Sequence, residues 1–587
     1  MTRRLRTGLV LALTAVLTAA CASLPTQGPV ERGSVESPSS AAAPFDFNPP
    51  GPEPGSTPAQ IVSGYLRALQ ATPVTTRVAA EFLGPESTVG WRPDRRTVVY
   101  GSQRVHQHGH HVRVHLGNVF ELDANGRWDP RHPGPGDHGA TAVDFHLVRD
   151  KGEWRITDPP DAMIVPRSHF ETRYRQYSLY FFDTAGQVLV PEPVYLPAGV
   201  QAPTLLVSAL LQGPRPENRA VERTFFPRGT KLQVSVPVGR DGVADVPLTA
   251  AVLDLGQDTR QLAVAQLAWT LRQVPEIQAV QMTVDGTPVE VPGSRGAVDV
   301  SAWQEYSPAI ASASTDLFGV RGDAIVQVVG EQPLEAADLG PYGAQPPRSL
   351  GVNMTGLHFA IVTTGGRQVV VLSRAGSDVA PRTAYVGSDV LRPMWDRTDR
   401  LWLVDRTPEG VRVLVGSRAG VRPIAAPGLR HQDVLAAALS RDGSRLAVAV
   451  AGSRRGSARL LVLRVVREGA GAPVRLTRAQ PLTTVTSPMQ VRGLSWRDPT
   501  TVAVLSRPSR TTSEVLLAAC DGSTASVGLN GAVDVLFARG AAVAASPGGP
   551  TALVVAADDG QLHQLDDSGR WVLGGGPTGL RIPAYVG

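Results

Sequence analysis

Closely spaced histidines are the residues of this sequence best suited to metal or proton chemistry. The group consists of His106, His108, His110, His111 and His115. The first three alternate, so on a β-strand they would share one face. A zinc site there would need a further ligand and supporting carboxylates, and no His-Glu-x-x-His motif or cysteine pair supplies them. We therefore predict surface histidines on a polar hairpin tip between residues 101 and 109 and no metal site, with a metal-binding or pH-sensing patch as the alternative.

Two further motifs have functional associations that their surroundings do not support. The segment Gly574–Gly579 matches Gly-x-Gly-x-x-Gly, but only eight residues follow it and one is Pro583, which leaves no room for the helix of a dinucleotide site. Cys520 follows an apolar run and is predicted to be a small buried residue rather than a reactive thiol. No Gly-x-Ser-x-Gly elbow or phosphate-binding loop occurs. The sequence predicts no catalytic residue and no cofactor, and we do not expect an enzyme.

The remaining chemistry-bearing residue is Cys21, which follows a secretory signal. Residues 1–20 begin with three arginines, continue with an apolar run over 9–17, and end in small residues up to Ala20. The apolar run is too short to span a bilayer, which needs about 20 residues. A cysteine after small residues resembles a bacterial lipobox, although Thr18 stands where leucine is preferred. We predict cleavage between Ala20 and Cys21 and lipid attachment to Cys21 by more than one acyl chain; the alternative is an ordinary secretory signal with an incidental cysteine.

Composition limits the classes of partner. The formal charge of +5 falls to +2 when the three arginines of residues 1–20 are removed. Lys151 and Lys231 are the only lysines, so the high pI reflects arginine used in place of lysine, and no run of five like charges occurs. Nucleic acid is therefore not an expected partner. After Cys21 only Cys520 remains, so the core, built from 42% apolar residues, must stabilise the chain without an internal disulfide.

The elements divide the mature chain into four segments. Residues 21–58 are rich in Pro, Ser, Gly and Ala and are predicted to be a lipidated flexible tether. Residues 59–197 open with a predicted helix. Its apolar residues recur at intervals of three and four residues and form one stripe: Ile61, Tyr65, Leu66 and Leu69. Strands are predicted at 96–100, 111–116, 140–149 and 153–156, with a hairpin turn at 150–152. This pattern predicts an N-terminal α+β domain in which a curved sheet packs on the helix. Aromatic residues then cluster over 170–182, and 190–197 is interpreted as an extended connector.

The third segment, 198–295, is predicted to be a compact α+β unit with two helices. The first helix covers 204–211 and stops at Gly213-Pro214. The second begins at Asp258, which has capping-box spacing to Gln261, and runs to about residue 273. Strands are predicted at 231–237, 243–247 and 277–284.

The fourth segment, 300–587, consists of short strands and turns that repeat. The repeats start near residues 351, 395, 440, 495 and 546, a spacing typical of propeller blades. The strand at 324–329 would complete a ring. We predict an all-β C-terminal propeller of five or six blades.

These segments, in this order, resemble the actinobacterial LpqB lipoproteins. The residues that carry the resemblance are 179–183, 190–197, 206–214, 226–232 and 260–267. The resemblance implies that 198–295 is a GerMN domain and that the chain is lipid-anchored at the extracytoplasmic face of the cell membrane. It also implies a non-catalytic accessory protein that associates with the extracellular domain of the Mtr sensor histidine kinase and modulates its signalling in envelope growth and division.

The alternative function is an envelope glycan-binding or hydrolytic protein with its site at the mouth of the propeller channel. Such sites usually need acidic or histidine side chains at loop ends. The propeller segment contains only His358, His431 and His563, in dissimilar contexts, and its aspartates mostly occupy turn motifs. The regulatory function is therefore the interpretation we favour.

Overall fold

In a computed structural model of the chain, the described residues are 47–587, with gaps at 130–139, 295, 311–312, 331, 418–419, 454–455, 468–473, 486–489, 524–534, 547–552, 567–568 and 575. Asp46–Gly587 forms one compact unit, which contains all of them. The predicted signal peptide, Ala20, Cys21 and most of the predicted tether lie outside the described residues. Among the helices that are described, none combines the length and apolar character that crossing a membrane requires.

The first helix is α2 (Pro58–Ala68), and the residues around its start explain where it begins. The Thr57 Oγ1 atom accepts a hydrogen bond from the Gln60 backbone N–H, and the Gln60 side chain accepts one from Thr57 N–H, at 3.4 and 2.8 Å. Pro58 occupies the first turn, where its missing N–H costs nothing. The predicted apolar stripe is confirmed, because Ile61, Tyr65 and Leu66 are buried.

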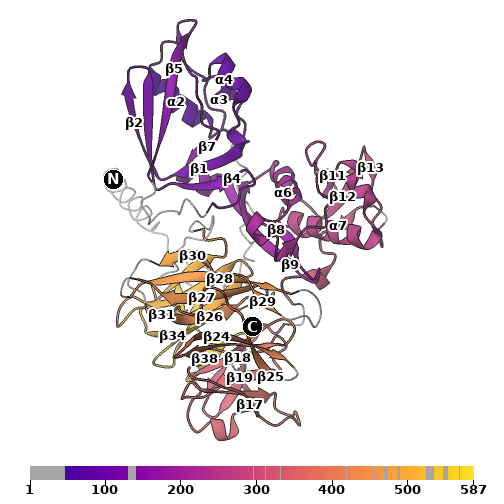
Figure 1. The fold of residues 1–587 in the computed structure, drawn as a ribbon, viewed down its shortest axis with the longest axis vertical. Helices are drawn as coiled ribbons and strands as arrows, with labels where there is room; N and C mark the ends of the chain where they lie inside the picture. The colour runs from indigo at the N-terminus through magenta and orange to yellow at the C-terminus, as the bar shows by residue number, and fades with distance from the viewer. Residues whose placement is uncertain are drawn as a thin grey trace, which may run out of the picture. The chain divides into compact units, whose positions relative to one another are not determined.

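The helix α2 packs on a four-stranded antiparallel sheet (Figure 1). In spatial order its strands are β2 (Ser102–His108), β3 (His111–Gly117), β5 (Thr141–Asp150) and β6 (Glu153–Ile156). The predicted turn between the last two is confirmed, with φ of +50° at Lys151 and +87° at Gly152. The expected α+β domain is therefore present. Short helices accompany it: α3 (Arg77–Ala80), α4 (Pro85–Gly90) and α5 (Arg167–Arg173).

The same part of the chain contains a second sheet of three strands, which alternate along the sequence with those of the first sheet. It consists of β4 (Phe120–Asp123), β1 (Arg96–Tyr100) and β7 (Met163–Pro166), with β1 and β7 parallel. Buried aromatic residues pack beside it: Phe120, Trp128, Phe170, Tyr174 and Tyr195. Tyr195 comes from the next element, so the aromatic cluster joins this sheet to the hairpin that follows.

The stretch interpreted as an extended connector is a buried β-strand. β8 (Tyr174–Asp183) and β9 (Leu189–Pro197) pair from Tyr174↔Pro197 to Phe182↔Leu189, and β9 is buried along nearly its whole length. Pro191 and Pro193 alternate, so their missing N–H groups fall on one edge of β9 while the other edge pairs with β8. The two prolines of β9 are therefore compatible with a strand.

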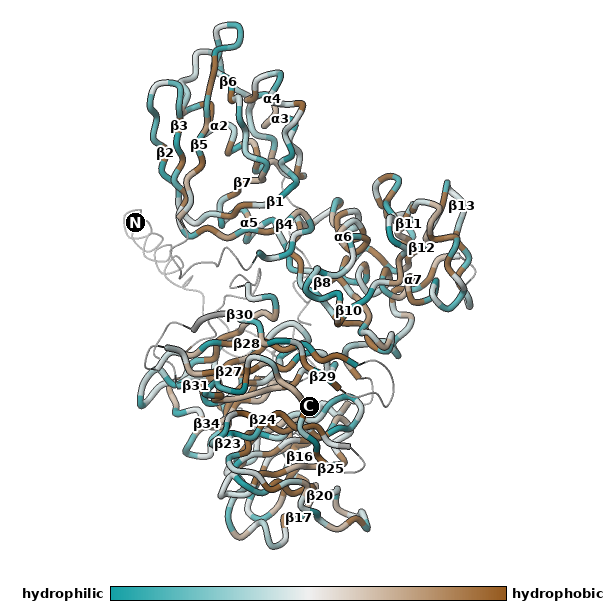
Figure 2. Tube along the Cα trace, viewed as in Figure 1, coloured by the Kyte–Doolittle hydropathy of each residue, from teal (hydrophilic) through white to brown (hydrophobic). Residues whose placement is uncertain are grey.

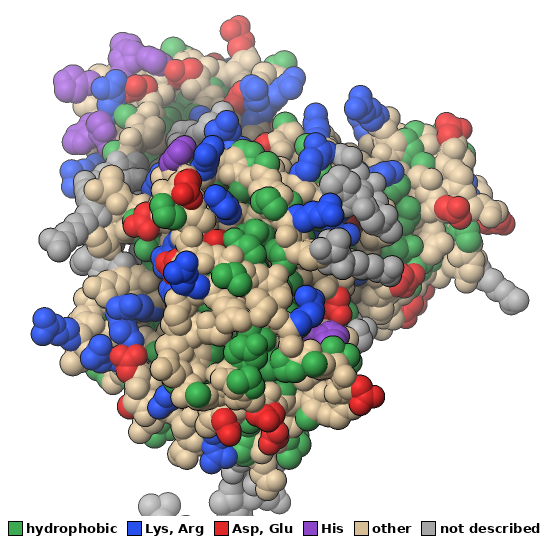
Figure 3. All heavy atoms as spheres, turned by 60° about the horizontal axis from the view of Figure 1, so that its bottom comes forward, with side chains coloured by type: hydrophobic (Ala, Val, Ile, Leu, Met, Phe, Trp, Pro, Cys, Tyr) green, Lys and Arg blue, Asp and Glu red, His purple; other side chains and the backbone are tan. Residues whose placement is uncertain are grey.

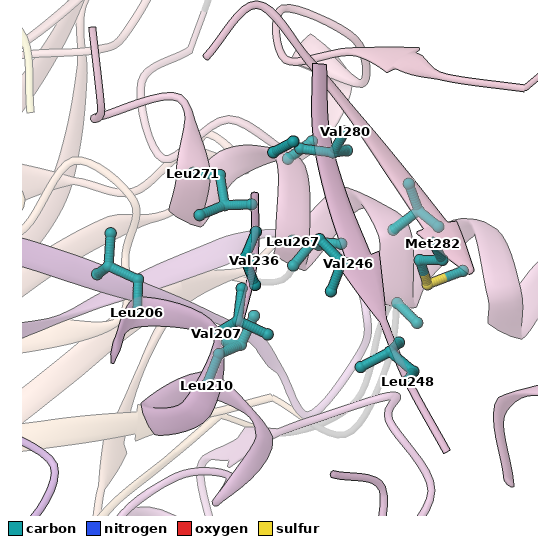
Figure 4. Packing of buried hydrophobic residues seen from close by; sticks show 14 of the residues in the cluster. Leu206, Val207, Leu210, Val236, Val246, Leu248, Leu267, Leu271, Val280 and Met282 are labelled. Carbon is teal, nitrogen blue, oxygen red and sulfur yellow. The ribbon is translucent and has the colours of Figure 1, made fainter. Parts of the chain in front are cut away.

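The hairpin shares its core with two helices and a small sheet. The helices are α6 (Ala202–Leu211) and α7 (Gln257–Leu271), and the strands of the small sheet are β11 (Val243–Pro247), β12 (Ala279–Val284), β13 (Thr287–Pro288) and β14 (Val298–Asp299). The short strand β10 (Glu222–Arg223) pairs with β8 and belongs to the sheet of the hairpin. β11 and β12 are parallel. Leu206, Leu267 and Val246 meet in this core (Figure 4), together with Leu179 and Val194 of the hairpin.

Two predictions in this region were wrong. The helix α7 begins at Gln257 after Gly256, without a side-chain cap, so Asp258 and Gln261 form no capping box. No regular strand is assigned at 231–237; isolated bridges occur at Leu232↔Leu248, within this range, and at Val238↔Ala244, just after it. Proline at 237 and 247 removes backbone donors from both segments, which interrupts the ladder.

The C-terminal region is a closed ring of sheets. Within the described residues it has six: β17-β16-β15-β38, β18 to β21, β22 to β25, β26 to β29 with β30, β31 to β33, and β34 to β37. The last described strand closes the ring, because β38 pairs with β15 at Phe318↔Ala584 and contacts β34 and β18 of the flanking sheets. The propeller class is thus confirmed and the blade number is six. Brown, hydrophobic strands dominate this region in Figure 2, whereas β2 is largely teal.

The propeller strands have the following bounds: β15 (Leu317–Arg321), β16 (Ala324–Val329), β17 (Gln332–Asp338), β18 (Ser349–Val352), β19 (His358–Val362), β20 (Gln368–Ser373), β21 (Arg382–Val386), β22 (Met394–Trp395), β23 (Leu401–Thr407), β24 (Gly410–Ser417), β25 (Gly420–Ile424), β26 (Val434–Leu439), β27 (Arg445–Ala451), β28 (Ala458–Val466), β29 (Arg475–Leu476), β30 (Gln480–Val485), β31 (Gln490–Asp498), β32 (Thr501–Arg507), β33 (Glu514–Ala519), β34 (Gly540–Ala545), β35 (Leu553–Ala557), β36 (Leu562–Leu565), β37 (Trp571–Leu573) and β38 (Arg581–Ala584). Aspartates of the turns serve the backbone as expected: the Oδ1 atoms of Asp396, Asp442 and Asp498 each accept a backbone N–H two residues ahead, at 2.8 Å.

In the turn after β4, the backbone of the hairpin comes so close that one position accommodates only glycine. Gly126 has φ +72°, and a Cβ there would lie 2.5 Å from the Tyr195 carbonyl oxygen. We expect Gly126→Ala to lower the free energy of unfolding by about 2 kcal/mol, from backbone strain plus a clash with backbone. Gly152→Ala is the matched control, because φ is +87° there but nothing lies within 4 Å. Urea denaturation of both variants measures the difference, and equal losses would contradict the role of the close approach.

Candidate functional site

The structure places the lesser sequence candidates in structural roles. Gly574–Gly579 lies between two strands, β37 and β38, so no helix follows it and the dinucleotide motif is coincidental. Cys520 is 7% exposed, and burial raises the pKa of its thiol to about 11. A thiol with that pKa is protonated at neutral pH and is a poor nucleophile, in agreement with the predicted buried residue.

Four of the five clustered histidines lie on a strand pair, and His110 lies at the hairpin tip. His106 and His108 belong to β2, His111 and His115 belong to β3, and the tip is the tight turn at Gly109-His110. The register also brings in His146 of β5, opposite His111, which sequence analysis did not single out. No group of three or more His, Cys, Asp or Glu side chains among the described residues is arranged to hold a metal ion.

A site that sequence analysis missed joins the β8–β9 hairpin to the propeller. It consists of Glu192 on β9, Glu222 on β10, and Arg445 and Arg464 on β27 and β28, and we call these four residues the buried junction. The Arg464 guanidinium donates to Glu222 Oε1 at 2.8 Å and to Glu192 Oε1 at 3.3 Å. The Arg445 side chain is fully buried and approaches Glu222 Oε1 at 4.0 Å. Both carboxylates are at most 3% exposed.

Neighbouring contacts surround the buried junction with further hydrogen bonds. Arg445 donates to the Pro191 carbonyl oxygen at 2.5 Å, and Asn218 donates to Glu192 Oε1. Tyr195 and Ser523 hydroxyls lie 2.5 Å apart. Charged and neutral hydrogen bonds between buried groups hold the hairpin against the propeller. This contact is specific, because a buried polar group that lost its partner would lower the stability of the folded chain.

The two carboxyl groups of the buried junction have opposite pKa shifts. Burial raises the pKa of Glu192, but Arg464, Glu222, Arg215 and Arg127 outweigh burial and lower it to about 2. Burial and the charge of Glu192 raise the pKa of Glu222 well above 4.5. The Oε2 atoms of both groups are buried. A proton held on Glu222 therefore lets one neutral and one ionised carboxyl share the site, as expected for like charges in close proximity.

In the propeller, the Arg441 side chain bridges β31, β34 and the residues that follow β38. Arg441 donates to the carbonyl oxygens of Val586 at 3.1 Å, Trp496 at 2.9 Å and Ala545. The cavity that remains beside Arg441, Arg392 and Trp496 has a volume of about 20 Å³. That is room for about one water molecule and not for a sugar ring.

The described residues define a multidomain protein in which a helix-on-sheet domain and a two-helix α+β domain precede a six-bladed propeller. Residues 51–171 match the N-terminal domain of lipoprotein LpqB, 178–290 match the family described as sporulation and spore germination, and 323–585 match the LpqB beta-propeller domain. None of these families is described as an enzyme. The chain belongs to the LpqB lipoprotein family.

Relatives resemble the chain along most of its length. Lipoprotein LpqB of Thermobifida fusca is 28% identical over 87% of this chain and 88% of that protein. Lipoprotein LpqB of Cutibacterium acnes is 25% identical over 97% of this chain and 98% of that protein. Among solved structures, the first GerMN domain of the sporulation protein GerM from Bacillus subtilis is 22% identical, covers 21% of this chain and 93% of that chain, and has a TM-score of 0.18.

Proposed function

We propose that this chain is a lipid-anchored extracytoplasmic accessory protein that regulates a sensor histidine kinase without catalysing a reaction. The observation that carries the proposal is the match of the whole three-domain order to the LpqB family. The resemblance names the Mtr kinase, acting in envelope growth and division, as the partner. The buried junction supports a binding role, because it holds the hairpin and the propeller together so that both can present one surface to a partner.

The anchor is the second part of the proposal. Acyl chains on Cys21, after cleavage following Ala20, would hold the protein at the outer face of the membrane. Confinement beside the kinase raises the effective concentration of the two proteins, so a weak contact between them suffices. Cross-linking in membranes followed by mass spectrometry tests the partner directly. Cross-links from the propeller or the two-helix domain to the kinase's extracellular domain are expected, and their absence while other membrane neighbours are captured would count against the kinase.

We expect Cys21→Ala to move the protein from the membrane fraction to the soluble fraction and to abolish its effect on kinase output. The physical reason is the loss of the thiol that carries the acyl chains. Cys520→Ala is the matched control, since that thiol is buried in the propeller and its removal leaves the anchor intact. Fractionation and kinase phosphorylation are measured together. A Cys21→Ala protein that stays in the membrane, or that regulates normally when released, contradicts the proposal.

A further inference from the structure

The outer face of the N-terminal sheet carries a regular array of imidazoles. On β3, Val112, Val114 and Leu116 point into the core at 1% exposure each, so the alternate residues His111 and His115 point outward. In the antiparallel register His115 faces Arg104, His111 faces His108 across one ladder, and His111 faces His146 across the next. Five histidines from three adjacent strands therefore share one exposed face: His106, His108, His111, His115 and His146.

The imidazoles are close enough to form one patch, which we call the histidine face. The ring centroids of His106 and His115 are 5.4 Å apart, and those of His111 and His146 are 4.5 Å apart. His110 at the turn lies 4.2 Å from His111. Histidine side chains gather in this way on the surface shown in Figure 3. The sheet presents them on an open surface and not in a cleft.

The fixed charges around the histidine face nearly cancel. Arg113 forms a two-hydrogen-bond pair with Asp144 at 2.6 and 2.9 Å, and His146 bonds Asp158 through its Nδ1 atom. The other charged residues on β2, β3, β5 and β6 and in the β5–β6 turn are Arg104, Arg149, Asp150, Lys151, Glu153 and Arg155. Arg149 stacks on Trp154, and Glu153 accepts a hydrogen bond from Gly55 N–H. Protonation of the five imidazoles therefore changes the face from a weakly charged surface to a strongly cationic one.

Imidazole ordinarily titrates near pH 6.5. Partial desolvation, with the neighbouring His110 and His146, lowers the pKa of His111, so this residue gains its proton at lower pH than an isolated histidine would. Each imidazole that gains a proton adds one positive charge to the face, so acidification makes the face more cationic.

We propose that the histidine face docks on an anionic phospholipid surface when the pH falls below neutrality. Charge complementarity and the open sheet fit a broad anionic plane better than a small ligand, and an anionic leaflet attracts each nearby basic group. Chain length supports the same occupant. Only 25 residues lie between Cys21 and Phe47, where the described chain begins, and that length spans at most about 90 Å. In this respect the inference rests on the proposed lipid anchor.

The experiment uses the whole mature chain from residue 22, without the acylated cysteine, so that binding reports the face and not the anchor. Vesicles of phosphatidylcholine with about one-third phosphatidylglycerol are compared with pure phosphatidylcholine vesicles at about pH 5.5 and about pH 7.5 by sedimentation. We expect binding to the anionic vesicles to rise roughly tenfold or more at the lower pH, and the neutral vesicles to bind at neither pH. Equal binding to neutral vesicles, or no rise at low pH, overturns the proposal.

Three substitutions on the exposed face separate charge from fold. Combined His106→Gln, His108→Gln and His115→Gln should lose most of the rise, whereas arginine at the same three positions should bind anionic vesicles at both pH values. Combined His358→Gln and His431→Gln, in the propeller, is the matched control and should keep the full rise. A response that survives the glutamine substitutions, or arginine variants that do not bind, refutes the histidine face as the docking surface. Neither result bears on the Cys21 anchor, which fractionation of the Cys21→Ala protein tests by itself.

Discussion

Arg464→Met is expected to lower the free energy of unfolding by about 3–5 kcal/mol, the cost of breaking a buried ion pair by removing one partner. Arg464 is the residue that contacts both carboxyl groups of the buried junction, at 2.8 and 3.3 Å, and its side chain is 14% exposed. Methionine preserves much of the side-chain volume, so the loss reports the uncompensated charge and not a cavity. The hairpin and the propeller would lose two charged hydrogen bonds that join them.

Urea denaturation followed by tryptophan fluorescence measures this loss. Arg412→Met is the matched control, because Arg412 and Glu409 form an exposed pair at 3.5 Å, with 54% and 63% exposed side chains. Arg412→Met should lower the free energy of unfolding by no more than about 1 kcal/mol. Combining Arg464→Met with Glu192→Gln and Glu222→Gln should recover part of the stability, since both carboxyl groups that lost Arg464 are then neutral and Arg445 keeps Asp442 at 3.5 Å. If the Arg464 and Arg412 variants are equally stable, the buried junction is not a stabilising contact.

Glu192→Gln and Glu222→Gln are expected to have opposite effects at neutral pH, although the two substitutions are chemically identical. Glu192 has a pKa lowered to about 2, so its stabilising contribution is present above pH 4.5, its ordinary value, and is lost as the pH falls toward 2. Glu192→Gln should therefore lower the free energy of unfolding by about 3 kcal/mol at pH 7. Glu222 has a raised pKa, so its contribution is present below pH 4.5 and decreases as the pH rises toward the folded-state pKa.

The pH dependence of unfolding distinguishes the two residues. While Glu222 holds a proton that the unfolded chain has released, stability should fall by up to about 1.4 kcal/mol for each pH unit above 4.5. Glu222→Gln removes this slope and should therefore be the more stable protein at alkaline pH. Denaturation midpoints at several pH values, for the original chain and both variants, provide the measurement. Equal destabilisation by the two substitutions would show that both carboxyl groups are ionised in the folded chain.

These expectations bear on the proposed regulatory role. If the hairpin and the propeller are joined by the buried junction, then Arg464→Met should weaken kinase regulation even when each domain remains folded. Regulation and stability measured on the same variant connect the contact to the function.

Sequence patterns determined the local elements and the order of domains, because these depend on neighbouring residues. The stripe of Ile61, Tyr65 and Leu66 defines a helix face within three turns, and Lys151-Gly152 defines a turn within two residues. The repeated strands of the C-terminal region likewise predicted a propeller, although only the pairing of β38 with β15 decided that it has six blades.

Tertiary structure alone decided which distant side chains meet. Glu192 and Arg464 are 272 residues apart in the chain, and His111 faces His146 only because β3 pairs with β5 in one register. A shift of that register by one residue would turn His146 to the opposite face. Within its own segment of sequence, each of these side chains looks like an ordinary polar residue. Burial, pairing and proton sharing arise only when separate strands pack against each other.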